Sequence, residues 1–371
     1  MLLIFLIFMA YSIAAILYVP SFYSYLSFVC VFFVSFPFLV SYKYTKYIET
    51  NIKFSFPKIP YFIVILGLAA GLTNLYVIAN NAGGSLSDIF SIDGIKAISY
   101  KSTTIRYEGS STTNSGNPFI LAISLFLLFI VGLNQEKNNG IKTVLLFLPI
   151  VLYTVLTTEK WPSFLAFVFF FCGVFYSNSL KDVFRFLIRN SKYLVLVGML
   201  AISTLMFRSG KSESILSLLN MICHYLLSSY YGLGYWLVNE YNEVPLTLGK
   251  YTLIGPLSFF PSLTGVFRSS GVYSESYYVY GNASNIYTAF RYLIQDFSVL
   301  GLFLINSIIS MFYVFFTKNG NYAVSESIRL VLLFCAMISL TVTIAVYNSV
   351  LLSIFMCTSY VFLCLVRNGS K

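Results

Sequence analysis

The sequence predicts an all-α polytopic membrane protein with about ten transmembrane helices and two long outer loops. Of its 371 residues, 58% are hydrophobic and only 10% are charged, whereas a soluble globular domain carries about 25% charged residues. The mean hydropathy is +0.81. So few charges could not cover the surface of a soluble fold of this length, so lipid is the solvent that the composition fits.

Ten apolar stretches are close to the length that a helix needs to cross a membrane, which is ~20 residues for ~30 Å of hydrocarbon. Asp, Glu, Lys and Arg are absent from their centres, and Arg329 lies at a margin. We expect one transmembrane domain over residues 1–371, built from spans at 2–19, 21–42, 60–80, 118–133, 143–157, 161–179, 193–207, 297–316, 328–346 and 350–366.

The net charge of +10 falls entirely on one side of this predicted topology. Fourteen Lys and Arg against four Asp and Glu occupy the loops on the side of the termini, and nine of each sign occupy the other side. The positive-inside rule makes the basic side cytoplasmic. Both termini are therefore expected in the cytoplasm, and the positive charge reflects topology rather than a nucleic-acid partner.

Two outer, periplasmic loops are long, at 81–117 and 208–296. The second contains apolar patches at 215–238 and 252–267, which would preserve the topology if both crossed the membrane. The turn between them carries Glu240, Glu243 and Lys250, and an acidic cytoplasmic turn would break the positive-inside rule. We therefore expect interfacial or re-entrant helices in this loop.

Several outer cations are candidate ligands for an anionic substrate. Arg106 in the first loop can grip a phosphate with two parallel hydrogen bonds, or be an ordinary solvated loop residue. Lys160 lies in a very short turn beside Trp161, where it can meet a lipid head group or simply anchor the helix end. Arg208, Lys250 and Arg268 add cations in the second loop.

His224 is the only histidine of the chain. Its ordinary pKa near neutrality makes it a candidate general base, and packing without a catalytic role is the alternative. The six cysteines form no CxxC pair, so neither a disulfide framework nor a zinc site is indicated. The sequence also carries no phosphate-binding loop and no dinucleotide fingerprint, so no cofactor and no metal is expected.

The stretch NIYTAFRYLIQDF, residues 285–297, leads directly into the span at 297–316. Wound as a helix of about 100° per residue, it gathers its polar residues in one arc of roughly 140°. This amphipathic helix either wets its polar side at the membrane surface or turns a polar wall toward a cavity, where ionisable residues at a membrane edge mark function. The residues in the arc are Asn285, Thr288, Arg291, Gln295 and Asp296.

This combination resembles the oligosaccharide repeat unit polymerases of the O-antigen polymerase (Wzy) type. Those proteins often carry the pattern N-x-x-T-x-F-R-x-x-x-x-D-F-G-x-x-G before a late span. The chain departs from it at Ser298, where the family has glycine, and Gly249-Lys250-Tyr251-Thr252 resembles a second family turn. The matching residues of the late motif are Asn285, Thr288, Phe290, Arg291, Asp296, Phe297 and Gly301.

The resemblance implies a membrane-embedded, inverting, metal-independent glycosyltransferase with a GT-C-like fold. It would transfer a growing glycan from undecaprenyl pyrophosphate to a lipid-linked repeat unit, with a chain-length regulator protein as a possible partner. Fixed cations would stabilise the departing pyrophosphate, and Asp296 or His224 would serve as base. Glu240, Glu243 and Glu275 are weaker candidates for the base. Catalytic roles are thus expected for Arg291, Asp296 and His224, and substrate binding for Arg106, Lys160, Arg208, Lys250, Arg268, Asn285 and Thr288.

Two other functions remain open at this point. An O-antigen ligase uses the same donor and a similar topology with a different acceptor. A flippase or transporter of lipid-linked oligosaccharides is disfavoured, because ion-coupled carriers keep ionisable residues near mid-membrane and show related halves. The span centres here are free of charge and no internal repeat is visible.

Overall fold

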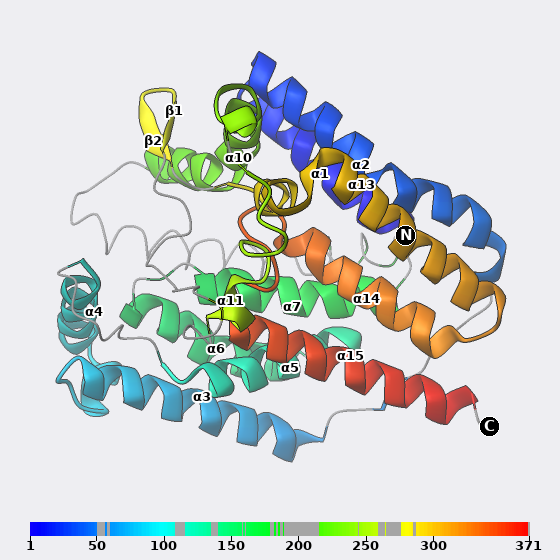
Figure 1. Ribbon diagram of the computed structural model, residues 1–371. Helices are drawn as coiled ribbons and strands as arrows, with labels where there is room; N and C mark the ends of the chain where they lie inside the picture. Colours follow the sequence, from blue (N-terminus) through cyan, green and yellow to red (C-terminus); the bar gives the residue numbers. More distant parts are fainter. Residues whose placement is uncertain are drawn as a thin grey trace. The chain divides into compact units, whose positions relative to one another are not determined.

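The computed structural model describes residues 1–49, 56–57, 60–107, 116–134, 140–157, 159, 161–178, 182, 185, 188, 215–243, 245–258, 264, 276–284 and 287–369. Within these residues it holds twelve α-helices, two short 3₁₀ helices and one β-hairpin (Figure 1). The chain divides into two compact units. Unit 1 comprises Met1–Phe54, Asn220–Ile354 and Thr358–Lys371, and unit 2 comprises Ser55–Leu219 and Phe355–Cys357.

Unit 1 is built around two long apolar helices, α2 (Phe22–Glu49) and α13 (Ala289–Lys318), which pack side by side in the same direction. The rings of Phe33 and Phe303 stack with their centroids 4.6 Å apart. The side-chain amide of Asn306 donates to the carbonyl oxygen of Val34 at 2.8 Å. Both helices therefore begin at one end of the unit, in agreement with the sidedness that the charges predict.

The remaining helices of unit 1 complete this bundle and its ends. α1 (Leu2–Tyr18) packs against both α2 and α14 (Tyr322–Ile338). The last helix, α15, spans Asn348–Gly369. Most of α10 (Ile215–Asn239) also belongs to unit 1, and the 3₁₀ helix η2 (Tyr241–Glu243) and the short α11 (Ile254–Leu257) follow it.

One end of unit 1, here called the outer end, gathers segments far apart in sequence. α10 crosses the start of α2, where the Ser27 hydroxyl donates to the Tyr230 carbonyl at 2.5 Å. The hairpin of β1 (Tyr277–Val279) and β2 (Asn282–Ser284) lies beside α10 in Figure 1. Its two-residue turn has positive φ at Tyr280 (51°) and Gly281 (78°), as expected for a primed hairpin turn. The Tyr280 hydroxyl donates to the carbonyl of Tyr18 at 3.0 Å.

Among the residues that the structure describes, unit 2 holds four apolar helices and one amphipathic helix. They are α3 (Tyr61–Asn81), α4 (Ile92–Tyr107), α5 (Pro118–Leu133), α6 (Gly140–Thr157) and α7 (Trp161–Ser177). α5 and α7 approach closely because Gly132 and Gly173 face each other's backbones, where any side chain would overlap the opposite helix. The predicted loop 81–117 folds in part, as η1 (Ser87–Phe90) and α4. Both pack on α3 and α6 through Ile89 and Ile98.

The predicted spans largely coincide with these helices, and the protein is a multi-pass membrane protein by their length and composition. α2, α3, α13 and α15 are long and apolar enough to cross a membrane, and α1, α5, α6 and α7 are apolar but shorter. The expected span at 193–207 lies outside the described residues.

The prediction of a span over 328–346 is wrong in its second half. α14 ends at Ile338, and 339–347 form turns. The Ser339 carbonyl accepts the N–H of Ala289 at 2.9 Å, and the Ala345 carbonyl accepts the N–H of Gly255 at 3.0 Å. The polar groups of this segment thus pair with the outer-end backbone instead of continuing a helix.

The two apolar patches of the second loop differ from each other. The first forms most of α10, which has 25 residues and is not among the helices apolar enough to cross the membrane within the described part of the chain. In the second patch, the described residues 252–258 form turns and the four-residue α11. The described residues of the two patches therefore add no pair of membrane spans, as expected from the acidic turn between the patches.

Candidate functional site

The candidate site centres on the first two turns of α13. The helix begins at Ala289 with Thr288 as its N-cap, and it breaks at Ser298, which has φ 64° and ψ 170°. The helix predicted to begin at Asn285 therefore starts four residues later, and Asn285 itself lies outside the described residues. Only glycine adopts such a φ and ψ readily, so this backbone is held by its surroundings.

The break at Ser298 frees backbone carbonyl groups of the helix to accept hydrogen bonds from another segment. The carbonyl oxygens of Gln295 and Asp296 accept the N–H groups of Thr247 (3.4 Å) and Leu248 (3.2 Å). The Ser298 hydroxyl accepts the N–H of Gly301 at 3.1 Å, which is the N-cap interaction of a new helical segment. α13 is therefore a short outer helix followed by a membrane-length helix, with the turn 247–252 bonded to the break.

Asp296 ties this turn to the helix. Its side chain is fully buried, and its carboxylate accepts the N–H of Tyr251 at 3.2 Å and the N–H of Thr252 at 2.5 Å. The hydroxyl of Thr247 donates to the same carboxylate. These three donors satisfy the buried charge, so Asp296 acts as the anchor of the turn.

Arg291 is also buried, with 1% of its surface exposed. Its guanidinium lies over the ring of Tyr287 at 3.8 Å and over that of Trp236 at 5.2 Å. One guanidinium nitrogen lies 3.7 Å from a carboxylate oxygen of Glu240, whose side chain is 29% exposed. A stacked, planar cation and one carboxylate thus form a pair in which only the carboxylate reaches the surface.

The polar face of the α13 segment is buried. Thr288 and Asp296 are fully covered, and Gln295 is 6% exposed. The interpretation of an interfacial helix that wets its polar side is therefore wrong, because this face packs against protein. Within the described part of the chain, the hydroxyl of Thr288, the carbonyl of the Gln295 side chain and the indole N–H of Trp236 have no hydrogen-bond partner.

His224 lies in the first half of α10, away from the end of the helix that carries Trp236. It precedes Trp236 by twelve residues, which is ~18 Å along a straight helix, so the fold does not bring it to Arg291. Burial lowers the pKa of His224 below its ordinary value, and a backbone hydrogen bond at Ala283 opposes that shift. The imidazole is therefore neutral at neutral pH and lies beside the hairpin.

The predicted substrate-binding cations divide into three groups. Lys250 is exposed in the turn that Asp296 anchors. Arg106 lies in α4 of unit 2. Lys160, Arg208 and Arg268 lie outside the described residues. Among the described residues no group of three or more His, Cys, Asp or Glu could hold a metal ion.

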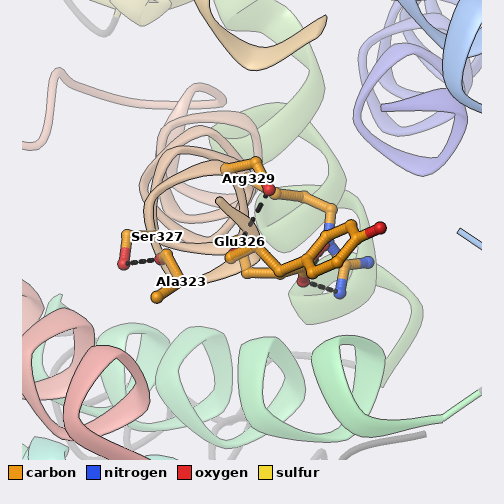
Figure 2. A network of polar contacts seen from close by, with 6 residues as sticks. Ala323, Glu326, Ser327 and Arg329 are labelled. Atoms are coloured by element: carbon orange, nitrogen blue, oxygen red, sulfur yellow. Dashed lines mark hydrogen bonds and ion pairs between the residues drawn. The ribbon is translucent and has the colours of Figure 1, made fainter. Parts of the chain in front are cut away.

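A second ion pair, which is partly buried, lies on α14 (Figure 2). The carboxylate of Glu326 accepts hydrogen bonds from Arg329 Nε at 2.8 Å and Nη2 at 2.6 Å. The hydroxyl of Ser327 donates to the carbonyl of Ala323 at 2.8 Å. Arg329, at the margin of a predicted span, is thus paired with the carboxylate of Glu326 one helical turn away, which fits a structural role.

The sequence indicates Glu240 only as a weaker candidate for the base, and it gives no signal that Trp236, Tyr287 or Thr247 belongs to the site. Trp236 and Glu240 are four residues apart at the end of α10, and the N–H of Glu240 donates to the carbonyl of Trp236 at 2.9 Å. That spacing places them on one side of a helix end. Nothing in the sequence links this helix end to Arg291, more than fifty residues later.

The chain was compared with known families, curated proteins and solved structures. No family model, no curated protein and no solved structure matches it.

Proposed function

We propose that this protein is an O-antigen polymerase, or the polymerase of a related surface polysaccharide. It transfers a growing glycan from undecaprenyl pyrophosphate to a lipid-linked repeat unit at the periplasmic face of the bacterial inner membrane. One observation carries the proposal. The two stretches that resemble the family, Gly249–Thr252 and Phe290–Gly301, are separated in sequence but joined directly through Asp296.

The reaction forms one glycosidic bond and breaks the glycosyl phosphate bond of the donor. The acceptor hydroxyl oxygen attacks the anomeric carbon, the bond from that carbon to the pyrophosphate breaks, and the pyrophosphate leaves on its lipid. The hydroxyl proton passes to a carboxylate. The leaving group is already activated, so positioned cations suffice to stabilise its charge.

The exposures and contacts support different roles for the two carboxylates. Asp296 is fully buried and accepts three hydrogen bonds, so it is a positioning residue. The side chain of Glu240 is 29% exposed, so an acceptor hydroxyl can reach it, and we assign it as the base. Arg291 holds Glu240 in place, because one guanidinium nitrogen lies 3.7 Å from a carboxylate oxygen of Glu240.

The remaining features of the proposal follow from the family resemblance and from the sidedness of the charges. The resemblance implies a GT-C-like arrangement of about ten spans, and the excess of basic residues on one side favours both termini in the cytoplasm. Lys250, which is exposed in the turn anchored by Asp296, is the outer cation that we assign to the pyrophosphate or the glycan. A chain-length regulator protein is the expected partner.

Deletion of the gene with complementation tests the proposal on a lipopolysaccharide gel. A polymerase deletion leaves a lipid A core that carries a single repeat. Bare core with polymer still on the lipid carrier would instead indicate a ligase, and a normal ladder would exclude both functions.

Arg291→Ala, expressed from a plasmid in the deletion strain, should give no ladder while the protein remains in the membrane. Arg185→Ala is the matched control, because the side chain of Arg185 is 67% exposed and its pair with Asp182, at 3.5 Å, lies at the surface. Full-length ladders from the Arg291 variant would remove this residue from the mechanism.

A further inference from the structure

The turn that Asp296 anchors exposes an unusual set of side chains. Leu246, Leu248 and Leu253 are 52%, 82% and 45% exposed, and Lys250 between them is exposed as well. None of the four belongs to a membrane-length helix. Leucines and a lysine that alternate on one outer turn form an amphipathic surface of the kind that meets lipid at the membrane boundary.

The exposure of these leucines is imposed by the fold. Leu248 has φ 49° and Gly249 has φ 98°, and a leucine at positive φ carries a steric cost. The N–H of Leu248 donates to the carbonyl of Asp296 at 3.2 Å. The Asp296 carboxylate holds the other side of the turn through Tyr251 and Thr252. A strained and multiply bonded turn therefore presents Leu248 outward.

The turn also lies where the outer helix gives way to the membrane-length segment of α13. Gly249 packs near the ring of Phe297, so that an added Cβ would lie 3.9 Å from its Cζ. Ser298 then caps the apolar segment that runs to Lys318. The leucines and Lys250 are thus carried by a turn that is bonded to the start of the apolar segment of α13.

We propose that this turn, residues 246–253, binds the phosphate-bearing end of polyprenyl pyrophosphate. The leucines contact the isoprenoid units nearest the phosphate, and Lys250 pairs with the phosphate oxygens. The assignment of this lipid as donor rests on the proposed polymerase function. Arg291 precedes Asp296 by five residues, ~7.5 Å along the helix axis, so a lipid held here brings its sugar–phosphate bond toward Glu240.

This proximity favours the polyprenyl donor over bulk phospholipid. A general membrane anchor needs no particular distance from a buried arginine and carboxylate pair. The turn is fixed to the same short helix that carries Arg291, as expected of a surface that positions a reacting bond.

The test measures binding of undecaprenyl pyrophosphate to the purified full-length protein in phosphatidylcholine nanodiscs, by native mass spectrometry. Lys250→Gln should weaken binding roughly tenfold or more, because a charge-assisted contact to phosphate is lost. Leu248→Asn should weaken it also, and asparagine tolerates positive φ, so this variant keeps the turn folded. Lys96→Gln and Leu86→Asn, at an exposed lysine and an exposed leucine of unit 2, should bind like the wild type.

Three results would overturn the assignment. The first is wild-type affinity in both Lys250→Gln and Leu248→Asn. The second is displacement of undecaprenyl pyrophosphate by an equal concentration of dioleoylphosphatidylglycerol, which would make the turn a bulk-lipid contact. The third is displacement by inorganic pyrophosphate at low concentration, because the leucines would then contribute nothing.

This binding assay requires no polymerase activity. A normal ladder in the deletion strain would refute the polymerase function whatever the lipid affinities are. Unchanged affinities in the two variants would refute the docking turn even if the deletion strain lacks polymer.

Discussion

The carboxylate of Asp296 accepts the backbone N–H of Thr252, 44 residues earlier in the chain, at 2.5 Å. The same side chain accepts the N–H of Tyr251 and the hydroxyl of Thr247. One buried carboxylate thus fixes the turn that carries Lys250 onto the helix that carries Arg291.

Asp296→Asn should destabilise the protein by roughly 1–3 kcal/mol, because the new amide N–H group would face the N–H of Thr252 and leave buried donors unsatisfied. The midpoint of thermal unfolding of the purified protein in detergent measures this loss. Asp93→Asn, at an exposed position in the first turn of α4, is the control and should change the midpoint little. A wild-type midpoint in the Asp296 variant would contradict its role as anchor.

Ser298→Gly and Ser298→Ala should shift stability in opposite directions. Glycine relieves a backbone strain of roughly 1–3 kcal/mol at φ 64° and ψ 170°, and it costs only a few tenths of a kcal/mol as an N-cap. Alanine keeps the strain and loses the cap to Gly301, about 1 kcal/mol. Thermal unfolding should rank glycine above serine and serine above alanine. An alanine variant at least as stable as the glycine variant would refute this account of the break.

Gly234→Ala should destabilise unit 1 far more than Gly301→Ala does. An added Cβ at Gly234 would overlap the carbonyl oxygen of Tyr23 and force α10 away from α2. At Gly301 the nearest atoms, on Phe297 and Ser298, would lie 3.4 Å from the new Cβ, which is ordinary contact. Protease resistance of the two purified variants compares them directly. Equal resistance would mean that α10 does not pack on α2 as described.

Glu240→Gln should abolish polymer without unfolding the protein, because glutamine keeps the shape of the side chain and cannot accept the acceptor proton. The readout is the lipopolysaccharide ladder, with membrane abundance measured in parallel. Asp182→Asn, at a side chain that is 52% exposed, is the control and should keep a normal ladder. A full ladder from Glu240→Gln would return the choice of base to the remaining carboxylates and His224.

The spans were the part of the fold that the sequence predicted best. Apolar length alone located α1, α3, α5 and α7 within two residues of their ends, because a helix in lipid must satisfy its own backbone and be long enough to cross. The same reasoning placed a helix over 328–346, and there it was wrong after Ile338. The polar groups beyond that residue find partners at the outer end, at Ala289 and Gly255, and hydropathy carries no information about such partners.

The sequence by itself determined that this chain is a multi-pass membrane protein, and it singled out Arg291 and Asp296 as charges on the polar face of a helix that leads into a span. The periodicity of helices and the cost of charge in lipid decide both points locally. Only the tertiary structure decided that these two residues serve different segments. Asp296 meets the turn 247–252 and Arg291 meets Trp236, Tyr287 and Glu240. Most of these partners lie fifty or so residues away, and no local pattern encodes which distant backbone a buried charge will bind.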